Sequence, residues 1–341
     1  MQQFVSDYME GAAPEILDAL TRTNMEKTAG YGRDPYCESA RERIRRACNA
    51  PEAEVHFLVG GTQTNETIIS SLLQPWQGVL AAESGHVAVH EAGAIEHGGH
   101  KVLTVPGVDG KLSGDAVRSF VNAFYADANW EHEVAPGAVY VSQPTEYGTL
   151  YTLAELEDIR WACDDANLKL YIDGARLGYA LAAAGNDVSL PDLARLADVF
   201  YIGGTKVGCL FGEAVVFPKP GLIPHFYTIT KIHGGMLAKG RLLGIQFDTL
   251  FTDNLYERLG AHGDTCADRI RAALAERGYE LFKPSTTNQV MVSVTPEQAA
   301  ELAKRVEFGF MEALPNGREV IRFCTSWATC EEDVDELISL L

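Results

Sequence analysis

The stretch VFYIGGTKVGC, from Val199 to Cys209, places a lysine directly after an apolar run. The run is made of β-branched and aromatic residues, which is typical of a strand buried inside a sheet. Two glycines and a threonine then lead to Lys206. An amine enclosed by apolar neighbours has a lowered pKa and becomes a better nucleophile. The stretch therefore predicts either a reactive lysine at a strand end or an ordinary surface lysine.

Apolar runs alternate with helical patterns on both sides of this stretch. The runs fall at 54–61, 78–83, 100–106, 137–145, 168–174, 198–204 and 214–218. Helical patterns separate several of them, at 62–74, 86–98 and 152–167. Strands that are apolar throughout and separated by helices indicate a mostly parallel sheet covered on both faces. We therefore predict an α/β fold.

The pattern of alternating apolar runs and helices ends at about residue 236. Long helical patterns at 236–260 and 265–278 are followed by two strand-like runs, at 288–295 and 319–325, with helices at 296–306 and 330–341. We expect residues 26–240 to form a large domain and residues 241–341 a small α+β domain. The N-terminal segment, residues 1–25, is expected to pack on the small domain or on a partner subunit.

Composition limits the class of protein. The 341 residues carry 28 basic and 47 acidic side chains, a formal charge of −19, which argues against binding to nucleic acid or to an anionic membrane. No signal peptide or membrane-spanning run is recognisable, so a cytoplasmic protein is expected. The seven cysteines include no CxxC pair, and we expect reduced thiols, mostly buried.

Two further candidate sites fall at predicted strand ends. GGTQTN, at 60–65, joins a strand to a helix, so Gly61 and Thr62 could bind phosphate or simply begin the helix. LKLYIDGARLG, at 168–178, ends a strand with Asp173. A carboxylate at that depth needs a partner, either Arg176 or a protonated heterocycle. Asp173 and Lys206 lie about one βα unit apart, which favours one shared site.

The histidines allow two interpretations. His86, His90, His97 and His100 are close in sequence, and the first two have the spacing of a helical ligand pair. An HExxH motif is absent, however, so we expect no metal and interpret His86 as a ring that stacks on a flat cofactor.

Taken together, the motifs resemble the fold type I pyridoxal-phosphate enzymes, and more narrowly the threonine aldolases among the β-eliminating lyases. The resemblance covers nearly the whole chain and rests on eight motifs in the correct order. They are FVSDYMEGAAPEIL, GYGRDP, FLVGGTQTN, GHVAVHEAGA, YIDGARLG, GGTKVG, KIHGGM and IRFCTSW.

The resemblance implies pyridoxal 5'-phosphate as cofactor and assigns roles to individual residues. Lys206 would form the Schiff base, and Asp173 would keep the pyridine nitrogen protonated. Arg176 would lie near the ring oxygen and His86 on the ring, while Gly61, Thr62 and Thr205 would contact the phosphate.

The resemblance also implies a substrate site and an assembly. Arg322 would bind the substrate carboxylate, with Ser6 beside it. Tyr31 would reach the site of a neighbouring subunit, so a homodimer or homotetramer with shared active sites is expected.

The implied reaction is aldol cleavage of L-threonine, L-allo-threonine and related 3-hydroxy amino acids to glycine and an aldehyde. The chain departs from the family pattern at Glu146, because TEYG stands at 145–148 where many threonine aldolases have THNG. Glu146 could bind the substrate hydroxyl, act as the base, or indicate another reaction. The arginine that the family has directly after GGM is also absent from the KIHGGM motif. Lys239 or Arg241 could make its contact with the phosphate instead. The alternatives are β-elimination or amino transfer with the same cofactor, and a non-catalytic metal-binding protein.

Overall fold

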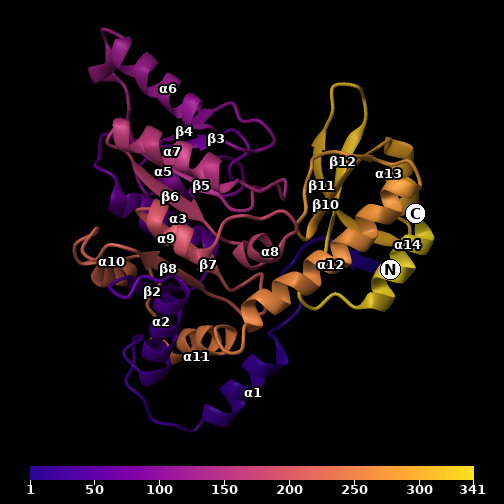
Figure 1. The fold of residues 1–341 in the computed structure, drawn as a ribbon, viewed down its shortest axis with the longest axis horizontal. Helices are drawn as coiled ribbons and strands as arrows, with labels where there is room; N and C mark the ends of the chain where they lie inside the picture. Colours follow the sequence, from indigo (N-terminus) through magenta and orange to yellow (C-terminus); the bar gives the residue numbers. More distant parts are fainter.

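A seven-stranded sheet forms the centre of the larger unit in the computed structural model, which describes residues 1–341 (Figure 1). In spatial order its strands are β2 (Glu54–Leu58), β8 (Glu213–Phe217), β7 (Val199–Gly203), β6 (Lys169–Asp173), β5 (Ala135–Ser142), β3 (Gln77–Ala82) and β4 (Val102–Val105). All neighbours are parallel except β8, which runs antiparallel to β2 and β7. The predicted mostly parallel seven-stranded sheet is confirmed.

Helices cover both faces of this sheet, as its apolar strands require. One face packs against α2 (Pro35–Ala47), α6 (Gly114–Ala126), α7 (Leu153–Asp165), α8 (Leu177–Ala182), α9 (Leu190–Leu196) and α11 (Arg241–Leu250). The other packs against α3 (Gly61–Leu72), α4 (His86–Val89), α5 (Ala94–His97) and α10 (Phe226–Ile232). A short 3₁₀ turn, η1 (Trp130–His132), follows α6. None of the helices is both long and apolar enough to cross a membrane.

The smaller unit is built on a five-stranded sheet. Its strands in spatial order are β1 (Gln2–Phe4), β11 (Val306–Ala313), β12 (Glu319–Cys324), β10 (Gln289–Val294) and β9 (Glu280–Leu281). Its core includes side chains from α12 (Leu255–Glu276), α13 (Pro296–Leu302) and α14 (Glu331–Leu340). β1 pairs in parallel with β11, so the N-terminus lies on this unit near the C-terminus (Figure 1). The helix α1 (Pro14–Thr23) packs against α11 instead.

The two units share α12, which runs between them as one helix of 22 residues (Figure 1). Leu255 and Tyr256 at its start belong to the core of the large sheet, whereas Ile270 and Leu274 belong to the core of the small unit. Leu243, Phe247 and Leu250 of α11 belong to the core of the large unit. The side chains of α12 therefore belong to both cores, and the boundary expected at residue 241 stays a prediction.

Three local expectations differ from the structure. The helix expected over 86–98 is split into α4 and α5, because Ala92 and Gly93 have positive φ values of 52° and 76°. The pattern at 236–260 is likewise interrupted before α12, at Asp253 and Asn254. The short strand β1 and the half-exposed β11 were not predicted, because neither is a continuous apolar run.

Candidate active site

Three tyrosines form a buried layer beneath the site. β5, β6 and β7 each carry one on the face covered by α3, namely Tyr140, Tyr171 and Tyr201. Side chains two positions apart on a strand share a face, so the residues that follow at the strand ends point the same way. These residues are Ser142 on β5 and Asp173 on β6, and Gly203 holds the corresponding position on β7. The sheet therefore directs polar groups into one place above the tyrosines.

A cavity at these strand ends brings most of the predicted site residues together. It is lined by Gly61, His86, Glu146, Asp173, Arg176, Thr205 and Lys206. It is also lined by Asn65, Ser142 and Glu213, which the sequence analysis did not single out. Ser6, Tyr31, Thr62 and Arg322 do not line it.

Lys206 follows β7 after Gly204 and Thr205 and lines the cavity. Burial lowers the pKa of Lys206, and the positive charge of Arg176 lowers it further. The carboxylates of Asp7, Asp173 and Glu213 oppose this shift without cancelling it. The amine is therefore more readily deprotonated, and more nucleophilic, than an exposed lysine.

Asp173 ends β6 and is only 3% exposed. One oxygen, Oδ2, accepts hydrogen bonds from the Tyr140 hydroxyl at 2.6 Å and from Asn65 Nδ2 at 3.1 Å. The other, Oδ1, accepts one from the backbone N–H of Ala175 at 2.9 Å. Asp173 forms no ion pair with Arg176, one of the two partners that the sequence predicts for it. Neutral donors hold this carboxylate in place, and no cationic side chain of the chain is bonded to it.

Arg176 is instead bound by Asp7, a residue the sequence analysis missed. The pair is bidentate, with Nε to Oδ2 at 2.6 Å and Nη2 to Oδ1 at 3.0 Å, and Asn288 Nδ2 donates to Oδ2 at 2.8 Å. Burial by itself raises the pKa of Asp7, but the charges of Arg176 and Lys206 and these hydrogen bonds outweigh it and lower the pKa to about 2. Asp7 stands beside Ser6 in the N-terminal motif, and that proximity was the available signal.

Glu146 lies in the loop after β5, at the rim of the cavity. Its Oε1 accepts hydrogen bonds from Ser142 Oγ at 2.7 Å and from the backbone N–H of His86 at 2.9 Å. Burial raises the pKa of Glu146, and the negative charge of Asp173 adds to the shift, while the bond from Ser142 opposes it. This carboxyl group therefore keeps its proton to higher pH than an ordinary glutamate.

The ring of His86 is held by Glu91, another residue that the sequence analysis did not single out. His86 Nδ1 lies 2.5 Å from Glu91 Oε1, which also accepts a hydrogen bond from Asn65 Nδ2 at 2.8 Å. His86 Nε2 makes no hydrogen bond within the chain. His100 Nδ1 lies 2.9 Å from the carbonyl oxygen of Gln77, the first residue of β3. No group of three or more histidine, cysteine or acidic side chains is arranged to hold a metal ion.

The start of α3 offers backbone donors to the cavity. Gly60 is its extended N-cap residue, and no side chain caps the helix, so the first N–H groups are free to bind an anion. The side chain of Thr62 is exposed. The hydroxyl of Thr205 donates to Glu213 Oε1 at 2.7 Å and accepts from the Gly212 N–H at 3.0 Å. Burial raises the pKa of Glu213 to about 8.

Arg322 and Ser6 lie next to the site rather than in its wall. Arg322 on β12 donates from Nη1 to Gln289 Oε1 and from Nη2 to the carbonyl of Val5, both at 2.9 Å, and its buried Nε has no partner. Ser6 therefore stands between Val5, which is bound to Arg322, and Asp7, which is bound to Arg176. This connects the small unit to the cavity through the N-terminal segment.

Tyr31 lies away from the cavity of its own chain. It has a positive φ of 60° and is 43% exposed, in the hollow lined by Tyr227 and Leu237. Lys239 and Arg241 line another cavity near residues 23–30, so neither contacts the Lys206 site of the same chain. All seven cysteines are free thiols, and only Cys330 is exposed, as predicted.

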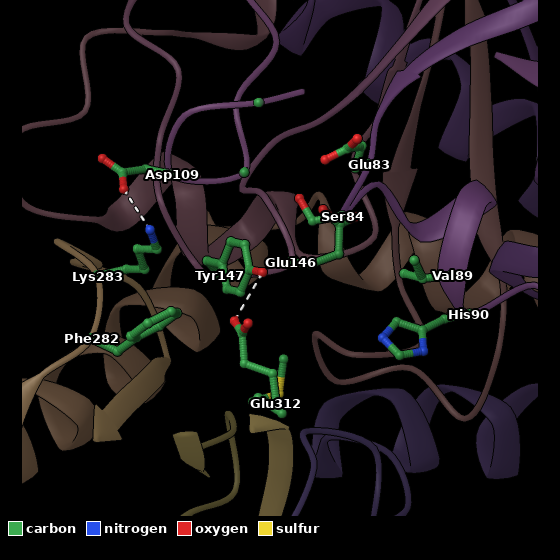
Figure 2. Close-up of a pocket in the computed structure, with 13 residues that line it drawn as sticks. Glu83, Ser84, Val89, His90, Asp109, Glu146, Tyr147, Phe282, Lys283 and Glu312 are labelled. Atoms are coloured by element: carbon green, nitrogen blue, oxygen red, sulfur yellow. Dashed lines mark hydrogen bonds and ion pairs between the residues drawn. The ribbon is translucent and has the colours of Figure 1, made fainter. Parts of the chain in front are cut away.

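A larger cavity, of about 440 Å³, adjoins the first and shares Glu146 with it (Figure 2). The large unit contributes Glu83, Ser84, His90 and Tyr147, and the small unit contributes Phe282, Lys283 and Glu312. Two contacts cross between the units here. Lys283 Nζ lies 2.9 Å from Asp109 Oδ1, and the Tyr147 hydroxyl donates to Glu312 Oε1 at 3.1 Å. Glu146 therefore lines both cavities, and the larger one lies between the two units.

Comparison with known proteins agrees with this geometry. A family model described as beta-eliminating lyase matches residues 3–297. The chain is 32% identical over 339 residues to the low specificity L-threonine aldolase of Pseudomonas sp. (strain NCIMB 10558), covering 98% of this chain and 96% of that one. The corresponding protein of Pseudomonas aeruginosa is 30% identical over the same shares of the two chains.

Solved structures agree as well. The threonine aldolase of Leishmania major is 44% identical, with a TM-score of 0.95, over 100% of this chain and 98% of that one. Aspartate aminotransferase from Thermus thermophilus is 16% identical with a TM-score of 0.72, over 100% of this chain and 90% of that one, a likeness that concerns the fold alone. The predicted fold type I architecture is confirmed. The chain belongs to the beta-eliminating lyase family, within its threonine aldolase group.

Proposed function

We propose that this protein cleaves L-threonine, L-allo-threonine and related 3-hydroxy amino acids to glycine and an aldehyde, with pyridoxal 5'-phosphate as cofactor. The observation that carries the proposal is the meeting of Lys206 and Asp173 in one cavity at the strand ends. The threonine aldolase relatives, similar over nearly their whole length, support the same reaction.

The residues of the cavity fit this cofactor. Lys206 has a lowered pKa, which suits an amine that must react with an aldehyde. Asp173 is a buried carboxylate that can pair with a protonated ring nitrogen, and the uncapped start of α3 beside Gly61 suits a phosphate. When bound, the cofactor supplies an electron sink that stabilises negative charge at the substrate Cα.

Other residues would position the substrate. Arg322 has the planar fork of donors that binds a carboxylate, and its buried Nε still lacks a partner. Arg176 is held by its ion pair with Asp7 and lines the cavity, where it would contact the ring oxygen of the cofactor. Ser6 would complete the carboxylate site from the segment between Val5 and Asp7.

Glu146 and His86 would handle the proton of the 3-hydroxyl group. Both line the cavity, and the backbone of His86 is bonded to the carboxyl group of Glu146. Burial raises the pKa of Glu146, which favours a carboxyl group that donates a hydrogen bond to the hydroxyl oxygen. The larger cavity beyond Glu146 would receive the substituent on Cβ.

We also propose a homodimeric or homotetrameric enzyme in the cytoplasm. Tyr31 is exposed and distant from the cavity of its own chain, which is consistent with a role in the site of a partner subunit. The thiol content, with all seven cysteines unpaired, suits a reducing compartment.

The decisive experiment compares wild type with Lys206→Ala. Purified wild-type protein loaded with the cofactor should be yellow, change its visible spectrum on adding glycine, and release acetaldehyde from L-threonine. Lys206→Ala should remain folded but lose the cofactor absorbance band of the wild type and all turnover. Formation of pyruvate and ammonia, or a requirement for a keto acid, would instead identify β-elimination or amino transfer. Full activity of Lys206→Ala would refute the assignment of the reactive amine.

A further inference from the structure

Glu91 is a buried carboxylate whose place in the fold has no structural explanation of its own. Its side chain is 0% exposed and lies just after α4. The oxygen Oε1 contacts His86 and Asn65, but the oxygen Oε2 is buried without any hydrogen-bond partner. A buried carboxylate with an unbonded oxygen costs free energy, and an apolar residue would avoid that cost. The position therefore needs a functional reason.

Asn65 fixes the carboxylate of Glu91 relative to the cavity. This amide is 1% exposed, and Nδ2 donates both to Glu91 Oε1 at 2.8 Å and to Asp173 Oδ2 at 3.1 Å. Its carbonyl oxygen accepts from the Tyr171 hydroxyl at 2.6 Å. Turning the amide over would set an oxygen against two carboxylates, so its orientation is determined. Glu91 is thus tied to the same network as Asp173.

The contact between Glu91 and His86 decides which ring nitrogen carries the proton. An ionised carboxylate only accepts hydrogen bonds, so Nδ1 at 2.5 Å from Oε1 must be protonated. In a neutral imidazole the lone pair then resides on Nε2, which has no partner in the chain while the ring lines the cavity.

We propose that Glu91 is a positioning residue that holds His86 as the Nδ1–H tautomer and so presents the lone pair of Nε2 to the substrate. The inference rests on the proposed function, because the proton concerned is that of the 3-hydroxyl group. That proton moves from the substrate oxygen to Nε2, and the electron pair of the O–H bond forms the carbonyl of the aldehyde. The Cα–Cβ bond breaks, and its electron pair remains on Cα. The resulting imidazolium is stabilised by the carboxylate across the Nδ1–H bond.

The backbone of His86 supports this arrangement. Its N–H donates to Glu146 Oε1, so one carboxyl group holds the main chain and another holds the ring. Glu146 keeps its proton to higher pH than usual and is suited to donating, which leaves His86 as the accepting group. The two carboxyl groups therefore have different tasks on the same histidine.

The test measures the tautomer directly, by ¹⁵N NMR of histidine-labelled protein without cofactor. The His86 signal is assigned by its disappearance in His86→Gln. Wild type should show the Nδ1–H form, and Glu91→Leu should shift His86 toward the Nε2–H form that dominates in free histidine. Glu96→Gln, which changes an exposed carboxylate on α5, should leave the spectrum as in wild type. A persistent Nδ1–H form in Glu91→Leu would overturn the proposal.

Kinetics give an independent arm. Glu91→Gln and Glu91→Leu should lower kcat for threonine cleavage about 10- to 100-fold, the usual effect of losing the partner of a working histidine, with little change in KM. In a His86→Gln background Glu91→Leu should cost almost nothing more, because the residue acts through that ring. Additive losses would contradict this. If wild type does not cleave threonine at all, the proposed function fails, whereas the tautomer result still stands on its own.

Discussion

Asp173 is held by three neutral donors, and its negative charge is what remains available to the cavity. Asp173→Asn should therefore keep the shape of the site but lose the charge that stabilises a protonated ring nitrogen. We expect kcat for threonine to fall about 100-fold or more, with the cofactor still bound. Steady-state kinetics and the visible spectrum measure both. Asp165→Asn, an exposed carboxylate on α7, is the matched control, and equal effects of the two changes would remove the assigned role.

Glu146 is proposed to donate a hydrogen bond from its carboxyl group, and burial raises the pKa of that group. In wild type, kcat/KM for threonine should decline as pH rises through the ionisation of this group. Glu146→Gln carries a permanently neutral side chain of the same shape, so it should retain most of the activity and lack that decline. The measurement is the pH profile of both proteins. An inactive Gln variant, together with a wild-type rate that rises with pH, would show that the ionised carboxylate is needed instead.

Residues of the site differ in how far the sequence reveals them. Lys206 and Asp173 stand at the ends of apolar runs, where a charged group is conspicuous, and the structure brings both into one cavity. Asn65 stands among polar neighbours in a helix, and Glu91 and Asp7 stand in short loops, where such residues are usually exposed. Only the packing of α3 and of the N-terminal segment onto the strand ends makes them buried, and no local pattern encodes that contact.

The N-terminal segment connects β1 to the large unit through the ion pair of Asp7 with Arg176. The contribution of this ion pair to the free energy of unfolding should depend on pH. The pKa of Asp7 is about 2 in the folded protein against 3.8 for an ordinary aspartate. The ionised form is therefore stabilised by folding, and this contribution is complete above pH 4 and is lost as pH falls toward 2. Asp7→Asn should lower the free energy of unfolding by about 2 kcal/mol at neutral pH, taking 1.36 kcal/mol per pKa unit.

Denaturant unfolding of both proteins between pH 7 and pH 3 checks this expectation. The difference between wild type and Asp7→Asn should shrink as the pH is lowered. A difference that stays constant with pH would mean that the lost hydrogen bonds, rather than the charge, account for the effect. Asp18→Asn, on the exposed side of α1, provides the control.

The helix α12 contains a carboxyl group, that of Asp264, whose pKa is shifted in the opposite direction to that of Asp7. Asp264 is buried, neither of its carboxylate oxygens has a hydrogen-bond partner, and burial raises its pKa from 3.8 to about 9. Folding therefore keeps a proton that the unfolded chain loses, so this residue reduces stability progressively as pH rises from about 4 to about 9. Asp264→Asn should gain stability relative to wild type across that range, by an amount on the order of a few kcal/mol. Thermal unfolding at pH 5 and pH 8.5 would show the gain growing with pH, and an equal shift at both values would contradict the buried protonated state.

Elements were predictable where one run of sequence determines them. Each strand of the large sheet coincides with a mostly apolar run that the sequence predicts as a strand. The direction of β8 follows from residues 204–212, which are too few for a helical crossover and so require an antiparallel pair. The strand β11 has an exposed, mixed face, and its pairing with β1 joins residues about 300 positions apart. Such pairings depend on the whole fold, and the local pattern does not reveal them.

At the scale of the whole molecule, the substrate would lie between two units, each of which has its own hydrophobic core. The large unit supplies Lys206 and Asp173, and the small unit supplies Arg322 from β12. The contacts of Lys283 with Asp109 and of Tyr147 with Glu312 cross between the units at the larger cavity (Figure 2). Because α12 belongs to both cores, a change in its packing can alter the distance between Arg322 and Lys206 without touching either residue.

The proposed sharing of sites between subunits gives the last prediction. Tyr31 lies outside the cavity of its own chain, so Tyr31→Ala should impair the site of the neighbouring subunit, and Lys206→Ala should inactivate only its own. Each variant alone should be nearly inactive. Mixed in equal amounts after dissociation, the two form hybrids in which one site has both wild-type residues. Half of randomly formed pairs are hybrids with one good site of two, so about a quarter of wild-type activity should return. If Tyr31 served its own chain, every site would lack one of the two residues, and mixing would restore nothing.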